Sequence, residues 1–104
     1  MEFNMKLESA KLVTIIVDEA IENKIIEELR SVQVKGFTCT EARGEGLNSA
    51  HISSWEGKNI RIETLVSDNK ALKIIEIMAE KYLDKFGMIV FSSDVQIFRK
   101  ERFN

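Results

Sequence analysis

The amino-acid sequence predicts an α+β domain in which one four-stranded antiparallel sheet carries two helices on a single face. Two observations support this prediction. Segments with the apolar spacing of strands and of helices alternate in the order strand, helix, strand, strand, helix, strand. The five glycines lie between these segments, so they divide the 104 residues into separate elements. A chain of this length suffices for one domain with one hydrophobic core.

The first part of the chain predicts a strand followed by a capped helix. Residues 11–17 read KLVTIIV, a β-branched run that is typical of a buried strand. Asp18 then serves as the helix N-cap. Apolar residues follow at spacings of four, four and three, which is one helical face: Ile21, Ile25, Leu29 and Val32. Lys35 and Gly36 provide a basic last turn and a terminal glycine, so we expect this helix to end there.

The middle of the chain predicts two more strands. Apolar and polar residues alternate along residues 37–43 and along residues 58–66 in the manner of strands. The second segment places Ile60, Ile62 and Thr64 on one face.

A second helix and a last strand complete the order of elements. Ser67 or Asp68 caps the helix, and Gly87 ends it. Its apolar positions keep helical spacing: Ala71, Ile75, Met78, Tyr82 and Phe86. Residues 88–98 form an apolar-rich strand that leads into a charged tail, residues 99–104. The resulting βαββαβ order is the ferredoxin-like split βαβ arrangement.

The first strand is apolar on both faces, because Leu12, Thr14 and Ile16 alternate with the other apolar residues of the strand. Two helices cover only one face of a four-stranded sheet, and a strand of this kind requires cover on both. One large side chain or the tail is the simpler cover. We favour an oligomer that packs these faces together, since large apolar patches are uncommon on monomers.

Composition excludes several classes of function. The 15 basic and 17 acidic residues give a net charge of −2, so no positive field indicates a nucleic-acid partner. One cysteine, Cys39, and one histidine, His51, exclude a disulfide framework and a multi-histidine zinc site. No apolar run approaches ~18 residues, and the acidic start is unlike a signal peptide. We therefore expect one cytoplasmic domain over residues 1–104.

The segment joining the two middle strands, residues 44–57, is the most informative part of the chain. A hairpin needs a turn of about two to five residues, and this segment is much longer and is bounded by glycines. It is either an inconsequential loop or a mobile contact loop, with Ile52 and Trp55 as anchors for a partner. We favour the contact loop.

The remaining candidates do not form a catalytic site. Arg43 and the following glycines can approach an anion, but this signal is weak on its own. His51 is most simply a solvated loop residue, and Cys39 a small core residue. Glu41 and Glu63 lie on adjacent predicted strands without a nucleophile or a metal-ligand set around them. We therefore expect a protein that is not an enzyme.

One stretch of sequence resembles a known family. Residues 35–46, KGFTCTEARGEG, resemble the G-x-T-x-T-E-x-(K/R)-G-x-G strand that opens the long regulatory T-loop of the PII signalling proteins. Residues 58–68 resemble the third strand and capped second helix of that family. Residues 84–91 are similar to the PII-like branch associated with bicarbonate transport and carboxysomes. The resemblance extends over residues 11–102.

The resemblance implies a homotrimer that binds adenine nucleotides in the clefts between subunits. The loop at residues 44–57 would then report nucleotide occupancy to a membrane transporter or an enzyme, in inorganic carbon metabolism. Thr38 and Leu65 match positions that meet the adenine, and the other matches lie near ribose and phosphate. The implied nucleotide-binding residues are Thr38, Arg43, Gly44, Gly46, Leu65, Gly87 and Arg99.

Departures from the family pattern narrow the choice of expected ligands. The T-G-x-x-G-D-G-K phosphate turn is reduced to Gly87, with Lys85 as a substitute cation, which favours ADP, AMP or cyclic AMP over ATP. Asn48 replaces the glutamine that helps to hold magnesium and 2-oxoglutarate. The loop has no tyrosine to modify, and Arg102 would replace the second C-terminal arginine, whose position falls near Glu101.

Two alternative functions belong to other classes. A trimeric ferredoxin-like metal-binding protein similar to CutA would use His51 and loop carboxylates. A weak nucleotide hydrolase has no base or metal set in the sequence to support it. Titration with adenine nucleotides, against copper and zinc, separates the first alternative from the signalling protein.

Overall fold

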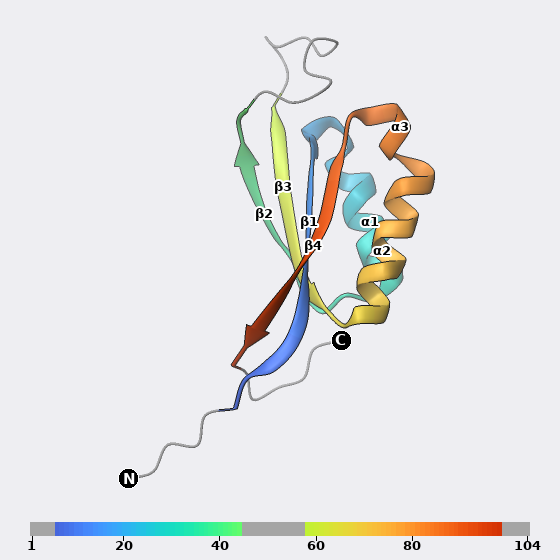
Figure 1. Cartoon of the computed structure of the whole chain (residues 1–104). Coiled ribbons are helices and arrows are strands. Elements are labelled where there is room, and N and C mark those ends of the chain that lie inside the picture. The colour runs from blue at the N-terminus through green and yellow to red at the C-terminus, as the bar shows by residue number, and fades with distance from the viewer. Residues whose placement is uncertain (1–5, 45–57, 99–104) are drawn as a thin grey trace.

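The computed structural model describes residues 6–44 and 58–98, and within them the predicted order of elements is confirmed (Figure 1). The sheet has the strand order β2-β3-β1-β4, and each neighbouring pair is antiparallel. This is the expected ferredoxin-like α+β fold. The elements are β1 (Glu8–Asp18), η1 (Glu19–Ile21), α1 (Glu22–Val32), β2 (Thr38–Ala42), β3 (Asn59–Val66), α2 (Asp68–Lys81), α3 (Leu83–Phe86) and β4 (Ile89–Ile97).

The helices lie against one face of the sheet, which we call the helix side (Figure 1). On this side the core joins alternate residues of β1 and β3 to the apolar stripes of α1 and α2. The predicted face of the first helix is buried throughout, and so is the predicted face of β3. The fully buried side chains include Val13, Ile15, Ile25, Leu29, Ile62, Val66, Ile74 and Met78.

The first helix begins one turn later than predicted and ends earlier. Asp18 is the expected cap, but its Oδ1 accepts from the Ala20 amide at 2.7 Å to start the 3-10 turn η1, and α1 follows it. At the other end Gln33, not Gly36, adopts the left-handed conformation, with φ 70°. The Val34 amide bonds the Leu29 carbonyl at 3.3 Å, and the Val34 side chain packs on the core. Burial of Val34 therefore turns the chain before the glycine.

The second helix differs from the prediction in phase and continuity. Of the two expected caps, Ser67 is the one used, and its side chain accepts from the Lys70 amide. Ile74 is fully buried and Ile75 only half-buried, so the core stripe includes Ile74 instead of the predicted Ile75. The helix breaks at Tyr82, where φ is −128°, and continues as α3. Packing against the sheet decides this phase, because both isoleucines fit a helical period.

The first strand begins at Glu8, three residues earlier than expected, because its pairing with β4 continues to the Glu8–Ile97 pair. The resulting β1–β4 ribbon projects beyond the ends of the helices (Figure 1). On the ribbon, the Lys11 ammonium contacts the Asp94 carboxylate in an exposed ion pair.

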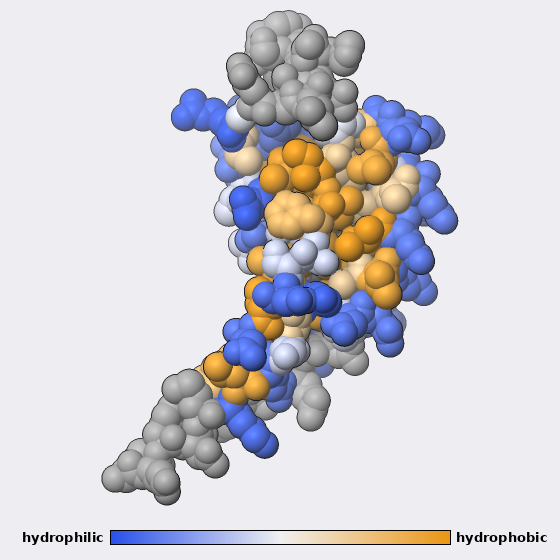
Figure 2. Space-filling view, viewed as in Figure 1, coloured by the Kyte–Doolittle hydropathy of each residue, from blue (hydrophilic) through white to orange (hydrophobic). Residues whose placement is uncertain are grey.

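The face away from the helices, the open face, carries apolar surface at a different place from the prediction. Thr14 is fully buried there, and Leu12 and Ile16 are already half-buried within one chain. The exposed apolar side chains belong to β4, where Ile89 is 43% and Phe91 is 41% exposed. Figure 2 shows apolar side chains gathered over this strand. No helix in the described ranges is long and apolar enough to cross a membrane.

Candidate functional site

The structure brings Thr38 and Leu65 together on the open face. Thr38 of β2 pairs directly with Glu63 of β3, and Leu65 lies two residues further along β3, on the same face. Diagonal neighbours of this kind are about 7–8 Å apart. Thr38 is exposed and Leu65 is half-buried, so both border solvent.

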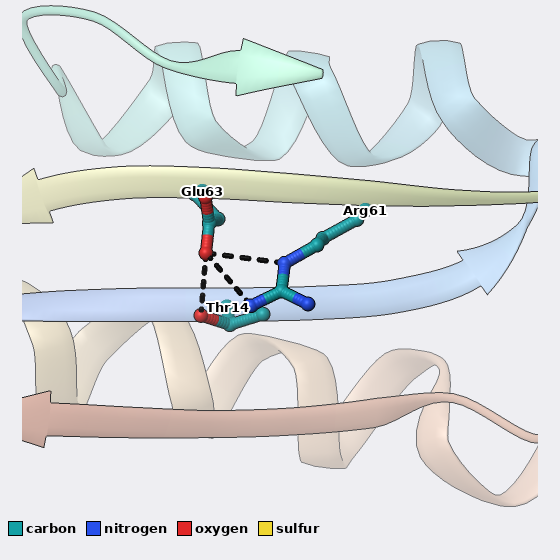
Figure 3. Close-up of polar contacts among 3 residues, drawn as sticks. All are labelled: Thr14, Arg61 and Glu63. Carbon is teal, nitrogen blue, oxygen red and sulfur yellow. Dashed lines mark hydrogen bonds and ion pairs between the residues drawn. The ribbon is translucent and has the colours of Figure 1, made fainter. Parts of the chain in front are cut away.

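A polar cluster lies beside this pair, centred on the Glu63 carboxylate (Figure 3). Its Oε2 accepts from Nε and Nη2 of Arg61, both at 3.1 Å, and from the Thr14 hydroxyl at 3.5 Å. Figure 3 shows the Arg61 side chain reaching from β3 across β1 toward Thr14. The Arg61 guanidinium thus forms an ion pair with the Glu63 carboxylate of the same strand. The inclusion of Thr14 was missed, although the alternation of β1 already placed it on this face.

Arg43 and Gly44 lie beyond the far end of β2 and are both exposed. Arg43 is five residues after Thr38, which is about 16 Å along an extended strand. At this distance Arg43 does not contact the Thr38–Leu65 pair. An added Cβ at Gly44 would meet no atom of residues 6–44 or 58–98 within 4 Å.

Gly87 lies at the same end of the sheet as Arg43 but at the opposite edge. It has φ 60° and joins α3 to β4. If the β1–β4 register is continued two residues past the Ile16–Ile89 pair, Gly87 falls level with Asp18, which is itself level with Ala42 across β3. Three interstrand spacings, about 14 Å, therefore separate the two edges. One chain does not bring Arg43 and Gly87 to the same phosphate group.

Comparison with known proteins now identifies the family. The family model described as "Nitrogen regulatory protein P-II" matches residues 10–102. The chain belongs to the P-II family. Among curated relatives, the nitrogen regulatory protein GlnK of Escherichia coli strain K12 is 27% identical over 86 residues, covering 74% of this chain and 77% of GlnK.

Solved structures of P-II-like proteins share the fold. A PII-like signalling protein from Thermus thermophilus is 39% identical and has a TM-score of 0.77, over 89% of this chain and 93% of that one. The protein CPII from Thiomonas intermedia K12, bound to ADP, AMP and acetate, has a TM-score of 0.80 at 24% identity, over 91% of this chain and 94% of CPII. CPII has also been solved with ADP, AMP and bicarbonate, with a TM-score of 0.80 at 23% identity, over 96% of this chain and 98% of CPII.

Several predicted site residues of this P-II protein lie outside the described ranges. They are Gly46, Ile52, Trp55 and Arg99, together with His51. The two carboxylates on adjacent strands do not form a pair. Glu41 lies opposite Ile60 on the helix side, whereas Glu63 lies on the open face.

Cys39 of this P-II protein is a half-buried residue packed against the core on the helix side. Burial, followed by the charge of Glu22 and a hydrogen bond with it, raises the pKa of the Cys39 thiol. A raised pKa keeps the thiol protonated and unreactive at neutral pH, as expected for a core residue. Within residues 6–44 and 58–98, no group of three or more His, Cys, Asp or Glu side chains could hold a metal ion.

Proposed function

We propose that this P-II family member is a trimeric signalling protein that binds an adenine nucleotide between two subunits. Its loop, residues 44–57, transmits nucleotide occupancy to a membrane transporter or an enzyme. The observation that carries the proposal is the distribution of the predicted binding residues. Thr38 and Leu65 lie together on the open face, whereas Arg43 and Gly87 lie at opposite edges of the sheet.

A second copy of the chain resolves this separation. If the β2 edge of one subunit lies beside the β4 edge of the next subunit, Arg43 of the first comes close to Gly87 of the second. The exposed Ile89 and Phe91 on the edge strand β4 favour such contact, because long apolar edge strands are rarely left uncovered. The sites then exist only in the assembly.

The ligand proposed is ADP, AMP or cyclic AMP, with ATP bound more weakly. The structures of the fold relative CPII contain ADP and AMP. In this chain the turn before β4 has a single glycine, Gly87, with the exposed Lys85 two residues earlier. Such a turn has fewer backbone amides free for a triphosphate than a glycine-rich turn has. The protein acts by binding and is not an enzyme.

The test of ligand binding is calorimetry with ADP, AMP, ATP and cyclic AMP, and with copper and zinc. Arg43→Ala and Arg99→Ala are each expected to weaken nucleotide binding by about 1.5–3 kcal/mol, the range for charge-assisted hydrogen bonds. Arg30→Ala on α1, exposed on the helix side, is the matched control and should leave the affinity unchanged. Metal binding without nucleotide binding would instead favour the CutA-like function.

The signalling step is tested separately. Nucleotide binding at the base of the loop is expected to change the hydrogen exchange of residues 43–57 and the fluorescence of the single tryptophan, Trp55. The coupling between the two sites should be about 1–3 kcal/mol. Equal exchange with and without saturating nucleotide, and with the target present, would leave a nucleotide-binding protein without a switch. The resemblance to the bicarbonate-associated branch makes inorganic carbon metabolism the setting proposed for the target.

A further inference from the structure

The connection between α1 and β2 is tied to β3 by a buried threonine. Thr64 is 3% exposed and lies on the helix side among apolar neighbours. Its hydroxyl donates to the Gly36 carbonyl at 2.6 Å. Gly36 itself is exposed, so its carbonyl belongs to a surface turn and not to the core. The bond therefore restrains the turn from inside the molecule.

This bond lies on the opposite face of the sheet from the two positions that we propose meet the adenine, and it restrains the backbone next to both of them. Gly36 is two residues before Thr38, and Thr64 is the chain neighbour of Leu65. The α1–β2 and β3–α2 connections meet at the same end of the sheet (Figure 1). A second restraint acts there, because Lys70 Nζ donates to the Gln33 carbonyl at 2.7 Å.

The start of β2 depends on such restraints. Within the described residues β2 is an edge strand of five residues, and its pairing with β3 begins at the Thr38–Glu63 pair. Short edge strands are held by few ladder hydrogen bonds, so the residue that enters the ladder moves easily. A displacement at Gly36 would move Thr38 relative to Leu65.

Packing alone does not account for the hydroxyl. The other core positions of β3 are Ile60, Ile62 and Val66, all apolar. A valine at position 64 would have the same shape and would leave no polar group to satisfy. The hydroxyl at this position therefore contributes the bond to Gly36.

From these contacts we propose that Thr64 is a positioning residue that sets the base specificity of the nucleotide site. The proposal rests on the proposed function. Thr64 holds Thr38 and Leu65 at the separation that fits adenine. A site that reads a ligand by hydrogen bonds discriminates steeply against a ligand that cannot make them, so a loosened site loses selectivity as well as affinity.

The test compares ADP with GDP as ligands of the whole protein. Thr64→Val removes the hydroxyl at constant shape, and Thr64→Ser keeps the hydroxyl. Ile25→Val, a buried change near the far end of α1, is a control for a general loss of core packing. Thr64→Ala serves as a second variant without the hydroxyl if the valine form folds poorly, and thermal unfolding is recorded for each protein.

The ratio of ADP to GDP affinity is expected to fall about fivefold in Thr64→Val, the equivalent of one hydrogen bond. The ratio should be kept in Thr64→Ser and in Ile25→Val. If the wild type prefers ADP and both Thr64→Val and Thr64→Ala keep that preference, this inference is overturned and the proposed function remains intact. A wild-type protein that binds neither nucleotide would overturn both.

Discussion

At the scale of single residues, Tyr82 has the most informative environment. It is buried at the junction of α2 and α3, and its hydroxyl donates to Glu28 Oε2 at 2.7 Å. Lys81 Nζ bonds the same oxygen at 3.1 Å. Burial alone would raise the pKa of Glu28, but the hydrogen bonds from Tyr82 and Lys81 outweigh burial and lower that pKa. One carboxylate therefore joins α1 to the end of α2.

Tyr82 predicts a loss of stability at high pH. Burial, with the hydrogen bond to Glu28, raises the pKa of Tyr82 to about 12. The pKa of Tyr82 in the folded protein lies above its value of about 10 in the unfolded chain. The stabilisation by the protonated Tyr82 hydroxyl is therefore complete below pH ~10 and is lost as the pH rises toward 12. Chemical unfolding of the wild type should show this loss between pH 9 and pH 12, and Tyr82→Phe should show a smaller one. Equal pH profiles would contradict the assignment.

Gln33 predicts a stabilising substitution. A non-glycine residue at φ 70° is strained, whereas glycine adopts this conformation without a steric cost. Gln33→Gly should raise the free energy of unfolding by about 0.5–1 kcal/mol. The carbonyl that accepts from Lys70 is retained in this variant. Gln33→Val, with a branched Cβ, should lower the free energy of unfolding. Denaturant unfolding measures both variants, and midpoints that shift in the same direction would contradict this prediction.

At the scale of elements, α2 is held by one face, and its phase is a property of the packing. Adjacent isoleucines offer two alternative stripes, and the structure buries Ile74 completely while Ile75 remains half-buried. The same helix is fixed at its start by Ser67 and at its break by Tyr82.

The phase of α2 is tested by two alanine variants. Ile74→Ala should lower the free energy of unfolding by about 2–5 kcal/mol, because it leaves a cavity in the core. Ile75→Ala is the matched control of identical chemistry and should cost clearly less. Thermal or urea unfolding measures both. Similar losses in the two variants would mean that the helix is rotated from the orientation described.

At the scale of the whole molecule, the apolar surface of β4 connects the fold to assembly. Helices cover one face of the sheet, and the edge strand β4 has Ile89 and Phe91 exposed in a single chain. The Thr14–Arg61–Glu63 cluster lies on the same open face (Figure 3). The proposed trimer would cover this apolar edge.

Light scattering tests the assembly. The wild type should have the mass of a trimer at micromolar concentration, and Phe91→Lys should reduce the mass because it places a charge in the apolar contact. Leu72→Lys is the control. Leu72 is 63% exposed on α2 and is not part of the β4 surface, so this variant should remain trimeric. A wild type with the mass of a monomer would remove the site between subunits.

The elements and their order follow from the sequence, because each element depends on local apolar spacing. The alternation of β1 and β3 and the helical stripe of α1 each specify one type of structure. Caps such as Asp18 and Ser67 could be predicted because their side chains bond amides only two or three residues away. The family resemblance also implied that Thr38 and Leu65 share one site, and strand pairing makes them diagonal neighbours on one face.

The way in which distant segments meet depends on packing across the whole fold. The end of α1 at Gln33 follows from burial of Val34 against the core, which no local signal contains. The strand order puts Arg43 and Gly87 at opposite edges, because β1 pairs with both β3 and β4 and therefore lies in the interior of the sheet. Contacts such as Thr64 with Gly36 join residues 28 positions apart, so they arise from the packed fold and not from any local pattern.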